Sequence, residues 1–270
     1  MTGRMSQAVR DGLIVMWRNL KRVPRIPELA IFAIIQSIMF VLLFAFVFGG
    51  AIVLPGYADP NAFREYLMPG IFAQTIVFAS ATTAIGMADD THKGIIDRFR
   101  SLPMARSAVL SGRALSDVVY NGGILIVLMI SGLFVGWTVR TGIPELLSGI
   151  GLLLLFAFAM SWLGVWLGLS VPTVEVAQQV GFTVLFPITF ISNVFVATAT
   201  LPTWLQPVAE WNPTSTLTAS LRQLWGNPSP PTGSTSFAAQ EPIMVTLAWV
   251  VLIVMVFGTL GVRKYRSLSR

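Results

Sequence analysis

The sequence contains no cysteine and a single histidine, His92. The absence of cysteine excludes disulfide bonds, thiolate metal sites and cysteine nucleophiles. One histidine argues against a zinc or haem site built by the protein. Common catalytic signatures are also missing, namely G-x-x-x-x-G-K-[ST], H-E-x-x-H, G-x-S-x-G and G-x-G-x-x-G. We therefore expect no catalytic, cofactor-binding or metal-binding residues, and we expect that the chain is not an enzyme.

Charge is scarce as well. Charged residues make up 11% of the 270 positions, whereas soluble domains carry about 25%. Apolar residues account for 54%, and the mean hydropathy is +0.74. A surface with so little charge must face something other than water, and lipid is the obvious candidate.

Six stretches are long enough to cross a bilayer and contain no charged residue. A helix needs roughly 20 apolar residues to span the hydrocarbon, whereas barrel strands are about 10 residues of alternating polarity. These stretches are continuous, so the sequence predicts an all-α integral membrane protein with six transmembrane helices. They are Leu29–Phe48, Tyr66–Met87, Val118–Val139, Leu146–Val171, Ala177–Ala199 and Ile243–Val262.

Lysine and arginine are distributed unevenly between the two sides of these spans. Six precede the first span, five lie between the second and third, and four follow the sixth. Only Arg64, Arg140 and Arg222 lie on the opposite side. The positive-inside rule therefore predicts an inner-membrane protein with both termini and the 88–117 loop in the cytoplasm. This bias accounts for the net charge of +6 without nucleic acid as a partner.

Two cytoplasmic segments have apolar faces at helical spacing. In Ser6–Arg22 an apolar stripe runs through Val9, Leu13, Met16, Trp17 and Leu20, which predicts an amphipathic helix at the membrane interface. It serves either as an anchor or in partner docking. In the 88–117 loop, Ile95, Ile96, Phe99 and Leu102 predict a short helix that packs on a protein or on the membrane surface.

The outer segment 200–242 predicts two short apolar helices. Asn212-Pro213 reads as an N-cap followed by proline at the first helical position, and Gly226 reads as the end of that helix. Helices this apolar are expected to dip into the outer leaflet or to pack on the spans.

The polar residues within the spans are neutral. Gln36, Gln74 and Asn193 are candidates for lining a translocation path, although interhelical hydrogen bonds explain such residues equally simply. Secondary transporters usually keep an ionisable residue inside the membrane, and none lies mid-span here. A transport bundle without an energy source suggests that the energy comes from a partner.

Three segments resemble the type-2 ABC exporter permeases, particularly the daunorubicin-resistance subgroup of drug and lipid exporters. The segments are YLMPGIFAQ, DDTHKGIIDRFRSLPMARSAVLSGRALSD and LPTWLQPVAEWNPTSTLTASLRQLW. With the six-span layout, the resemblance covers nearly the whole chain.

The resemblance implies a division of labour between this chain and its partners. The chain forms one transmembrane domain, with a connecting helix in 1–28, spans in 29–199, re-entrant helices in 200–242, and the last span with a basic tail in 243–270. A second permease, identical or homologous, joins it across spans 1 and 5. Two copies of a separate ATPase subunit bind ATP and Mg²⁺, so this chain needs no cofactor of its own. The complex exports an amphipathic drug or a lipid through the bilayer.

The resemblance also implies roles for particular residues. The connecting helix includes Arg10, Trp17 and Arg18. The two re-entrant helices, Thr203–Trp211 and Pro213–Trp225, close the exit. The residues expected to contact the ATPase from the coupling helix are Gly94, Ile95, Asp97, Arg98, Phe99, Arg100 and Leu102. The residues expected at the exit gate are Trp204, Trp211, Asn212, Pro213 and Arg222.

Other functions remain possible on the residues alone. An ATP-independent secondary transporter would work without an ATPase partner. A structural membrane protein would explain the spans but would leave the cytoplasmic loop helix and the outer helices without a role.

Overall fold

The protein is helical throughout the part that the computed structural model describes, which is residues 2–21, 27–48, 54, 56–57, 59, 62–96, 106–230 and 234–267. No strand occurs in these ranges, so the all-α prediction is confirmed for them. The elements are α1 (Thr2–Leu20), α2 (Pro27–Leu42), the π-helix η2 (Leu43–Phe48), α3 (Ala62–His92), α5 (Arg106–Val135), α6 (Ile143–Ser170), α7 (Val174–Phe190), the 3₁₀-helix η3 (Thr198–Thr200), α8 (Gln206–Trp211), α9 (Pro213–Trp225), α10 (Phe237–Gln240) and α11 (Pro242–Ser267).

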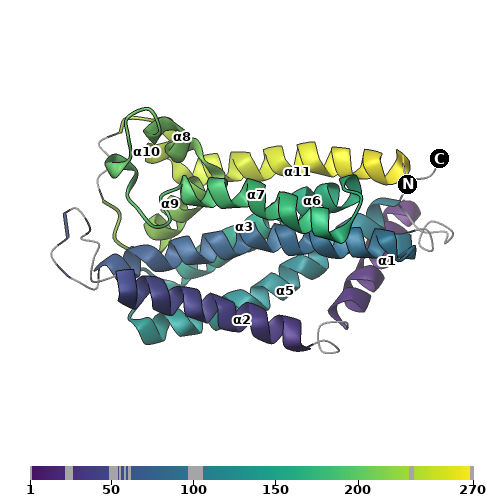
Figure 1. The fold of residues 1–270 in the computed structure, drawn as a ribbon, viewed down its shortest axis with the longest axis horizontal. Helices are drawn as coiled ribbons and strands as arrows, with labels where there is room; N and C mark the ends of the chain where they lie inside the picture. The colour runs from purple at the N-terminus through teal and green to yellow at the C-terminus, as the bar shows by residue number, and fades with distance from the viewer. Residues whose placement is uncertain are drawn as a thin grey trace.

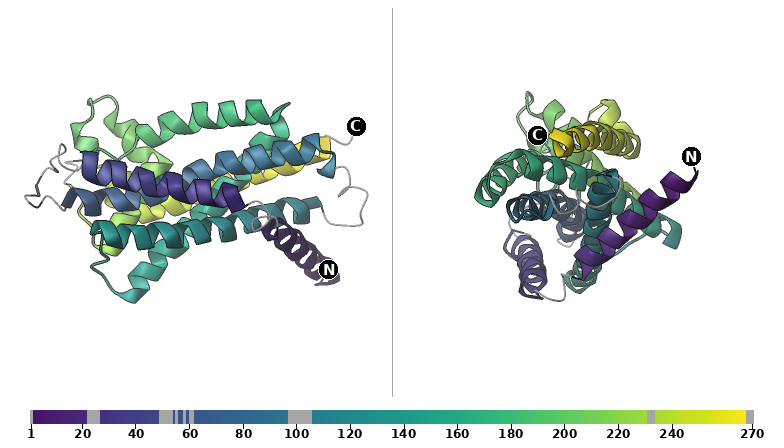
Figure 2. Two further views of the ribbon diagram at one scale, coloured as in Figure 1. Left: turned by 60° about the horizontal axis from the view of Figure 1, so that its bottom comes forward. Right: turned by 90° about the vertical axis from the view of Figure 1, so that its right-hand side faces the viewer.

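The long helices run along the longest axis of the molecule as one bundle (Figure 1). Within the described residues, four helices are long and apolar enough to cross a membrane, namely α3, α5, α6 and α11. Helix α1 lies obliquely at one end of the bundle, the end at which α11 also finishes, and we call this the α1 end (Figure 2). The short helices α8, α9 and α10 gather at the opposite end, which we call the α8–α10 end (Figure 1).

The first predicted span corresponds to α2 and η2, which together run from Pro27 to Phe48 without a break. The fifth corresponds to α7, a helix of 17 residues. Predicted span 5 reaches Ala199, but α7 ends at Phe190 and the chain then turns. The side-chain amide of Asn212 donates to the carbonyls of Ile188 and Ile191, at 2.6 and 2.7 Å. Because these carbonyls have a donor from α9's cap, the backbone leaves the helix without losing its hydrogen bonds.

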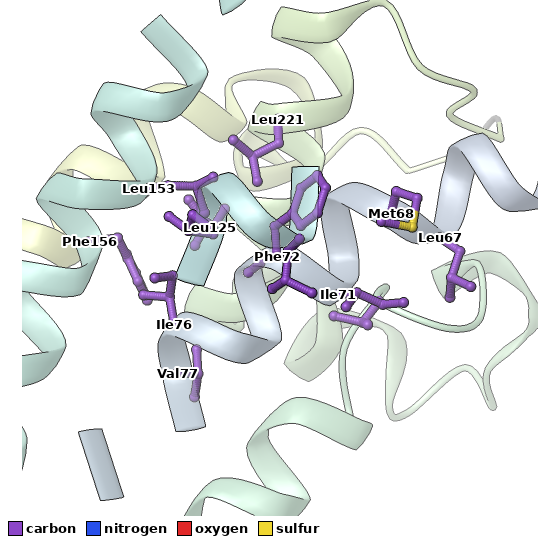
Figure 3. Close-up of a cluster of buried hydrophobic side chains, with 14 of the residues drawn as sticks. Leu67, Met68, Ile71, Phe72, Ile76, Val77, Leu125, Leu153, Phe156 and Leu221 are labelled. Carbon is purple, nitrogen blue, oxygen red and sulfur yellow. The ribbon is translucent and has the colours of Figure 1, made fainter. Parts of the chain in front are cut away.

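Helix α3 forms the centre of the bundle and packs on α6, α7 and α9. Its buried side chains form one apolar cluster with residues of α5, α6 and α9 (Figure 3). Phe72 and Ile76 of α3 lie beside Leu125 of α5 and Leu153 of α6 in this cluster. This packing holds the long helices together along the half of α3 nearest the α8–α10 end.

Small residues bring α3 and α6 close together. A Cβ atom added at Gly164 would collide with the backbone oxygen of Ser80, and one added at Gly168 would collide with that of Ala84. Both glycines lie on the face of α6 that packs against α3. Small residues at this spacing let two membrane helices approach closely, which increases their van der Waals contact.

Apolar side chains also cover much of the outside of the bundle. Phe134 of α5 is 87% exposed, and Phe32 of α2 and Met244 of α11 are also largely exposed. Exposed apolar surface on this scale is expected where hydrocarbon rather than water surrounds the helices. The chain is therefore a multi-pass membrane protein.

Candidate functional site

Helix α1 packs across the beginning of α5 at the α1 end. Gly12 and Val15 are buried there, and a Cβ atom added at Gly112 of α5 would press against both. The side chain of Asn19 donates to the hydroxyl of Ser116 at 3.4 Å. Helix α1 is thus fixed to the bundle by a narrow face of small and polar residues.

The outward face of α1 carries the amphipathic signal predicted from the sequence. Leu13 and Trp17 of the predicted stripe are 48% and 59% exposed, and Ile14 beside them is exposed too. Arg10 and Arg18 are also exposed. The predicted helix is present, and Leu13 and Trp17 of its stripe point away from the bundle, where they are available to the membrane surface or to a partner.

A buried ionic cluster joins the end of α3 to the beginning of α5. The guanidinium of Arg113 lies 3.4 Å from the carboxylate of Asp90 and 3.3 Å from that of Asp117. The hydroxyl of Thr83 donates to Asp117 at 2.8 Å. Gly86 leaves room for the guanidinium against α3, since a Cβ atom there would collide with it. We call these residues the Asp90–Arg113–Asp117 cluster.

This cluster escaped the sequence analysis. Arg113 was assigned to the cytoplasmic loop and Asp117 was placed just before span 3, but both lie inside α5. The available signal was their i, i+4 spacing, which places the two side chains on one helix face. The cluster matters because α3 and α5 flank residues 93–105, where the coupling helix was predicted.

Only the beginning of the predicted coupling segment lies within the described residues. Gly94 follows α3 with a φ of +66°, a backbone conformation that favours glycine. Ile95 is half-buried, whereas Ile96 is buried against a cluster that includes Leu110 and Tyr265. The start of the segment is therefore attached to α5 and to the end of α11. Asp97, Arg98, Phe99, Arg100 and Leu102 lie outside the described residues.

Helix α9 has the bounds and caps that the sequence predicts. The side chain of Asn212 accepts a hydrogen bond from the backbone N–H of Thr214 at 2.8 Å, and Pro213 occupies the first turn. Gly226 ends the helix with a φ of 66°. Asn212 thus caps α9 and, through its amide nitrogen, also holds the end of α7.

Arg222 fixes α9 to two other parts of the α8–α10 end. Its side chain is 1% exposed and donates to the backbone carbonyls of Tyr66, Asn193 and Val194 at 2.9, 2.9 and 3.3 Å. The guanidinium also lies 3.4 Å from the centre of the Tyr66 ring. Arg222 therefore joins α9 to α3 and to the turn that follows α7.

Helix α8 is shorter and more exposed than α9. It begins at Gln206 instead of the predicted Thr203, because residues 203–205 form a turn in which Leu205 N–H donates to the carbonyl of Pro202. Trp204 is 73% exposed and Trp211 is half exposed. The indole of Trp249 on α11 donates to the backbone carbonyl of Trp211 at 3.0 Å, which ties α8 to the last span.

The three neutral polar candidates for a translocation path have different surroundings. Gln36 is exposed on α2, whereas Gln74 is 4% exposed within α3. Asn193 is half-buried in the turn after α7, where its backbone N–H donates to the hydroxyl of Ser215. Its side-chain oxygen has no hydrogen-bond partner among the described residues. The geometry leaves Gln36 accessible, whereas Gln74 lies in the packed core and the side-chain oxygen of Asn193 is buried.

Two further polar contacts at the α8–α10 end were also missed. The guanidinium of Arg140 lies 2.9 Å from both carboxylate oxygens of the buried Glu65, and hydrogen bonding to this carboxylate raises the pKa of Arg140. The indole of Trp137 donates to the side chain of Asn227 at 2.9 Å. Both contacts join the α5–α6 connection to residues far away in the sequence, so no local pattern predicts them.

Comparison with known proteins places this arrangement in a family. Residues 11–224 match the ABC-2 type transporter family. The chain is 30% identical over 261 residues to the daunorubicin resistance ABC transporter permease protein DrrB1 of Streptomyces coeruleorubidus, covering 96% of this chain and 87% of that one. It is 21% identical over 263 residues to the putative transport permease ycf38 of Cyanophora paradoxa, covering 97% of this chain and 90% of that one. The chain therefore belongs to the ABC-2 type transporter family.

Proposed function

We propose that this chain is the transmembrane permease subunit of an ATP-driven exporter in the inner membrane. A separate nucleotide-binding subunit hydrolyses ATP, and the complex moves an amphipathic drug or a lipid-like molecule outward. Membership of the ABC-2 type transporter family is the observation that carries this proposal. The sequence lacks a phosphate-binding loop, which is consistent with ATP hydrolysis on a partner.

The α1 end has the features of a docking platform for that partner. The outward face of α1 presents Leu13 and Trp17 together with the charged Arg10 and Arg18. The Asp90–Arg113–Asp117 cluster links α3 to α5, the two helices on either side of the coupling segment. Movement of the ATPase against this segment is then passed directly to α3, the central helix of the bundle.

We place six spans in the membrane, with α2 and α7 as the first and fifth, and both termini in the cytoplasm. The positive-inside distribution of lysine and arginine supports this topology. Two permeases would meet through α2 and α7, which present exposed apolar side chains such as Met39 and Phe186. The exposed Gln36 on α2 would then face the substrate path between the two copies. The α8–α10 end would form the re-entrant unit at the outer surface.

Co-purification followed by an ATPase assay tests the proposal. The chain is purified in nanodiscs with its associated proteins, and the double variant Phe99→Ala/Arg100→Ala is compared with Arg263→Ala, which removes an exposed charge at the end of α11. We expect a stoichiometric ATP-hydrolysing subunit with the native chain and with Arg263→Ala, and its loss or uncoupling in the double variant. Flux through a chain purified without any ATPase, unaffected by nucleotide, would instead indicate a secondary transporter.

A further inference from the structure

A pocket of about 470 Å³ lies between α6, α7 and α11 under the short helices of the α8–α10 end. Helix α7 packs mainly on α3, and α11 packs mainly on α6; residues of both α7 and α11 line the pocket. Val77 of α3 and Phe156 of α6 form part of its inner wall, and both belong to the core cluster of Figure 3. A volume of this size lies within the range of small-molecule sites in proteins, roughly 300–1,000 Å³.

The lining of the pocket is almost entirely apolar. Asn212 contributes to it, but the amide of Asn212 already binds two carbonyls of α7 and its oxygen caps α9. The hydroxyl of Thr214 is the buried side-chain polar atom of the lining that has no partner among the described residues. An ordered water needs about two to four polar partners, so this pocket is unsuited to water.

The opening of the pocket faces the surroundings of the bundle. Val184 of α7, and Val208 and Trp211 of α8, line the pocket and are also about half exposed. These three side chains therefore mark its mouth, between α7 and α8. An empty cavity would forfeit van der Waals contacts along its walls, and a hydrocarbon chain entering from the bilayer would restore them.

The depth of the pocket matches one leaflet. On α11 its lining runs from Trp249 to Phe257, which at 1.5 Å per residue corresponds to about 12 Å along the membrane normal. The hydrocarbon core is about 30 Å thick, so this length corresponds to most of one leaflet. Two indoles, those of Trp211 and Trp249, lie at the end nearest α8, the position at which tryptophan meets lipid headgroups.

We propose that this pocket holds one acyl chain of a membrane phospholipid from the leaflet at the α8–α10 end. The chain fills the space between α7 and α11 and supports α8 from below. This site is separate from the substrate path proposed between two permeases. It depends on the membrane location of the chain and not on ATP-driven export, so the failure of one proposal leaves the other standing.

Photolabelling with a phospholipid tests the acyl-chain site. The permease is reconstituted in nanodiscs containing a phosphatidylcholine that carries a diazirine midway along one acyl chain, and the labelled peptides are identified by mass spectrometry. We expect labelling to concentrate on residues 184–188, 208–214 and 249–257, well above that of the exposed face of α5. A phosphatidylcholine with the diazirine in its headgroup should leave residues 253–257 unlabelled.

Two matched variants complete the test. Val184→Trp fills the mouth of the pocket and should remove most of the labelling of its lining. Val119→Trp, at a valine of α5 with 51% exposure compared with 48% for Val184, should leave that labelling unchanged. Val208→Trp provides a second way to close the mouth if Val184→Trp does not fold. Even labelling of all lipid-facing helices, or labelling that survives the closure of the mouth, would overturn the proposal.

Discussion

Replacing Arg222 by methionine tests whether this side chain holds the α8–α10 end together. The change keeps an apolar stem but removes the hydrogen bonds to Tyr66, Asn193 and Val194. The carbonyl of Asn193 keeps a donor, because the hydroxyl of Tyr66 also donates to it at 2.8 Å. The carbonyl of Tyr66 lies within α3, where the helix backbone supplies a donor. The carbonyl of Val194 is therefore the one that loses its hydrogen-bond donor.

The magnitude follows from these partners. A hydrogen bond from a charged group contributes about 1.5–3 kcal/mol, and a buried carbonyl left without its donor costs about 1–3 kcal/mol. The desolvation of a buried guanidinium offsets part of this sum. We therefore expect Arg222→Met to lower the free energy of unfolding by about 2–4 kcal/mol.

Thermal unfolding in nanodiscs, followed by tryptophan fluorescence, measures this effect. At about 2–4 °C per kcal/mol, the Tm should fall by roughly 5–15 °C. Arg222→Lys keeps the charge but loses the planar set of donors, so its Tm should lie between those of the native chain and Arg222→Met. Arg263→Met, at an exposed arginine of α11, should unfold like the native chain. An Arg222→Met variant that unfolds within about 2 °C of the native chain would refute the reasoning.

Three further predictions concern packing and buried polar groups. Arg113→Met leaves the carboxylates of Asp90 and Asp117 without their guanidinium and should lower the free energy of unfolding by about 3–5 kcal/mol in the same thermal assay. Lys93→Met removes an exposed ion pair and should lower it by less than about 1 kcal/mol. Gly164→Ala should separate α3 from α6 and cost about 1–3 kcal/mol, whereas Gly151→Ala on the same helix, with open space around it, should stabilise by about 0.5–1 kcal/mol. Trp137→Phe removes one buried hydrogen bond and should cost about 1 kcal/mol, seen as a lower midpoint of thermal unfolding; an unchanged midpoint would mean that the bond does not contribute.

Local patterns predicted much of the fold. Among the described residues, four of the six predicted spans correspond to long apolar helices, the first to α2 with η2, and the fifth to the shorter α7. The caps of α9 were predicted correctly, because Asn212, Pro213 and Gly226 act within a few residues of their own positions. The predicted fifth span ends at Ala199, beyond the end of α7 at Phe190. The residues after Phe190 are as apolar as those of a membrane helix, but side chains of α9 and its cap hold them in a turn.

The remaining features depend on contacts between distant segments. Nothing near Arg222 in the sequence indicates that its guanidinium binds carbonyls of residues 66, 193 and 194. The Asp90–Arg113–Asp117 cluster needs α3 and α5 to be adjacent before its charges meet. The face of α1 that packs on α5 carries no apolar pattern in the sequence, because it uses Gly12 and Val15, whereas the more apolar Leu13 and Trp17 point outward.

ATP-dependent transport in inside-out vesicles tests the central claim most directly. The vesicles contain this permease with its co-purified ATPase, and the probe is a fluorescent amphipathic drug whose emission falls as it accumulates in the vesicle lumen. We predict accumulation that requires ATP and Mg²⁺ and that stops when the partner can bind but not hydrolyse ATP. Accumulation of an NBD-labelled phospholipid in the lumenal leaflet, under the same nucleotide conditions, would identify a lipid as the cargo instead. Transport of either probe that continues without ATP, or that follows a proton gradient, would contradict the account.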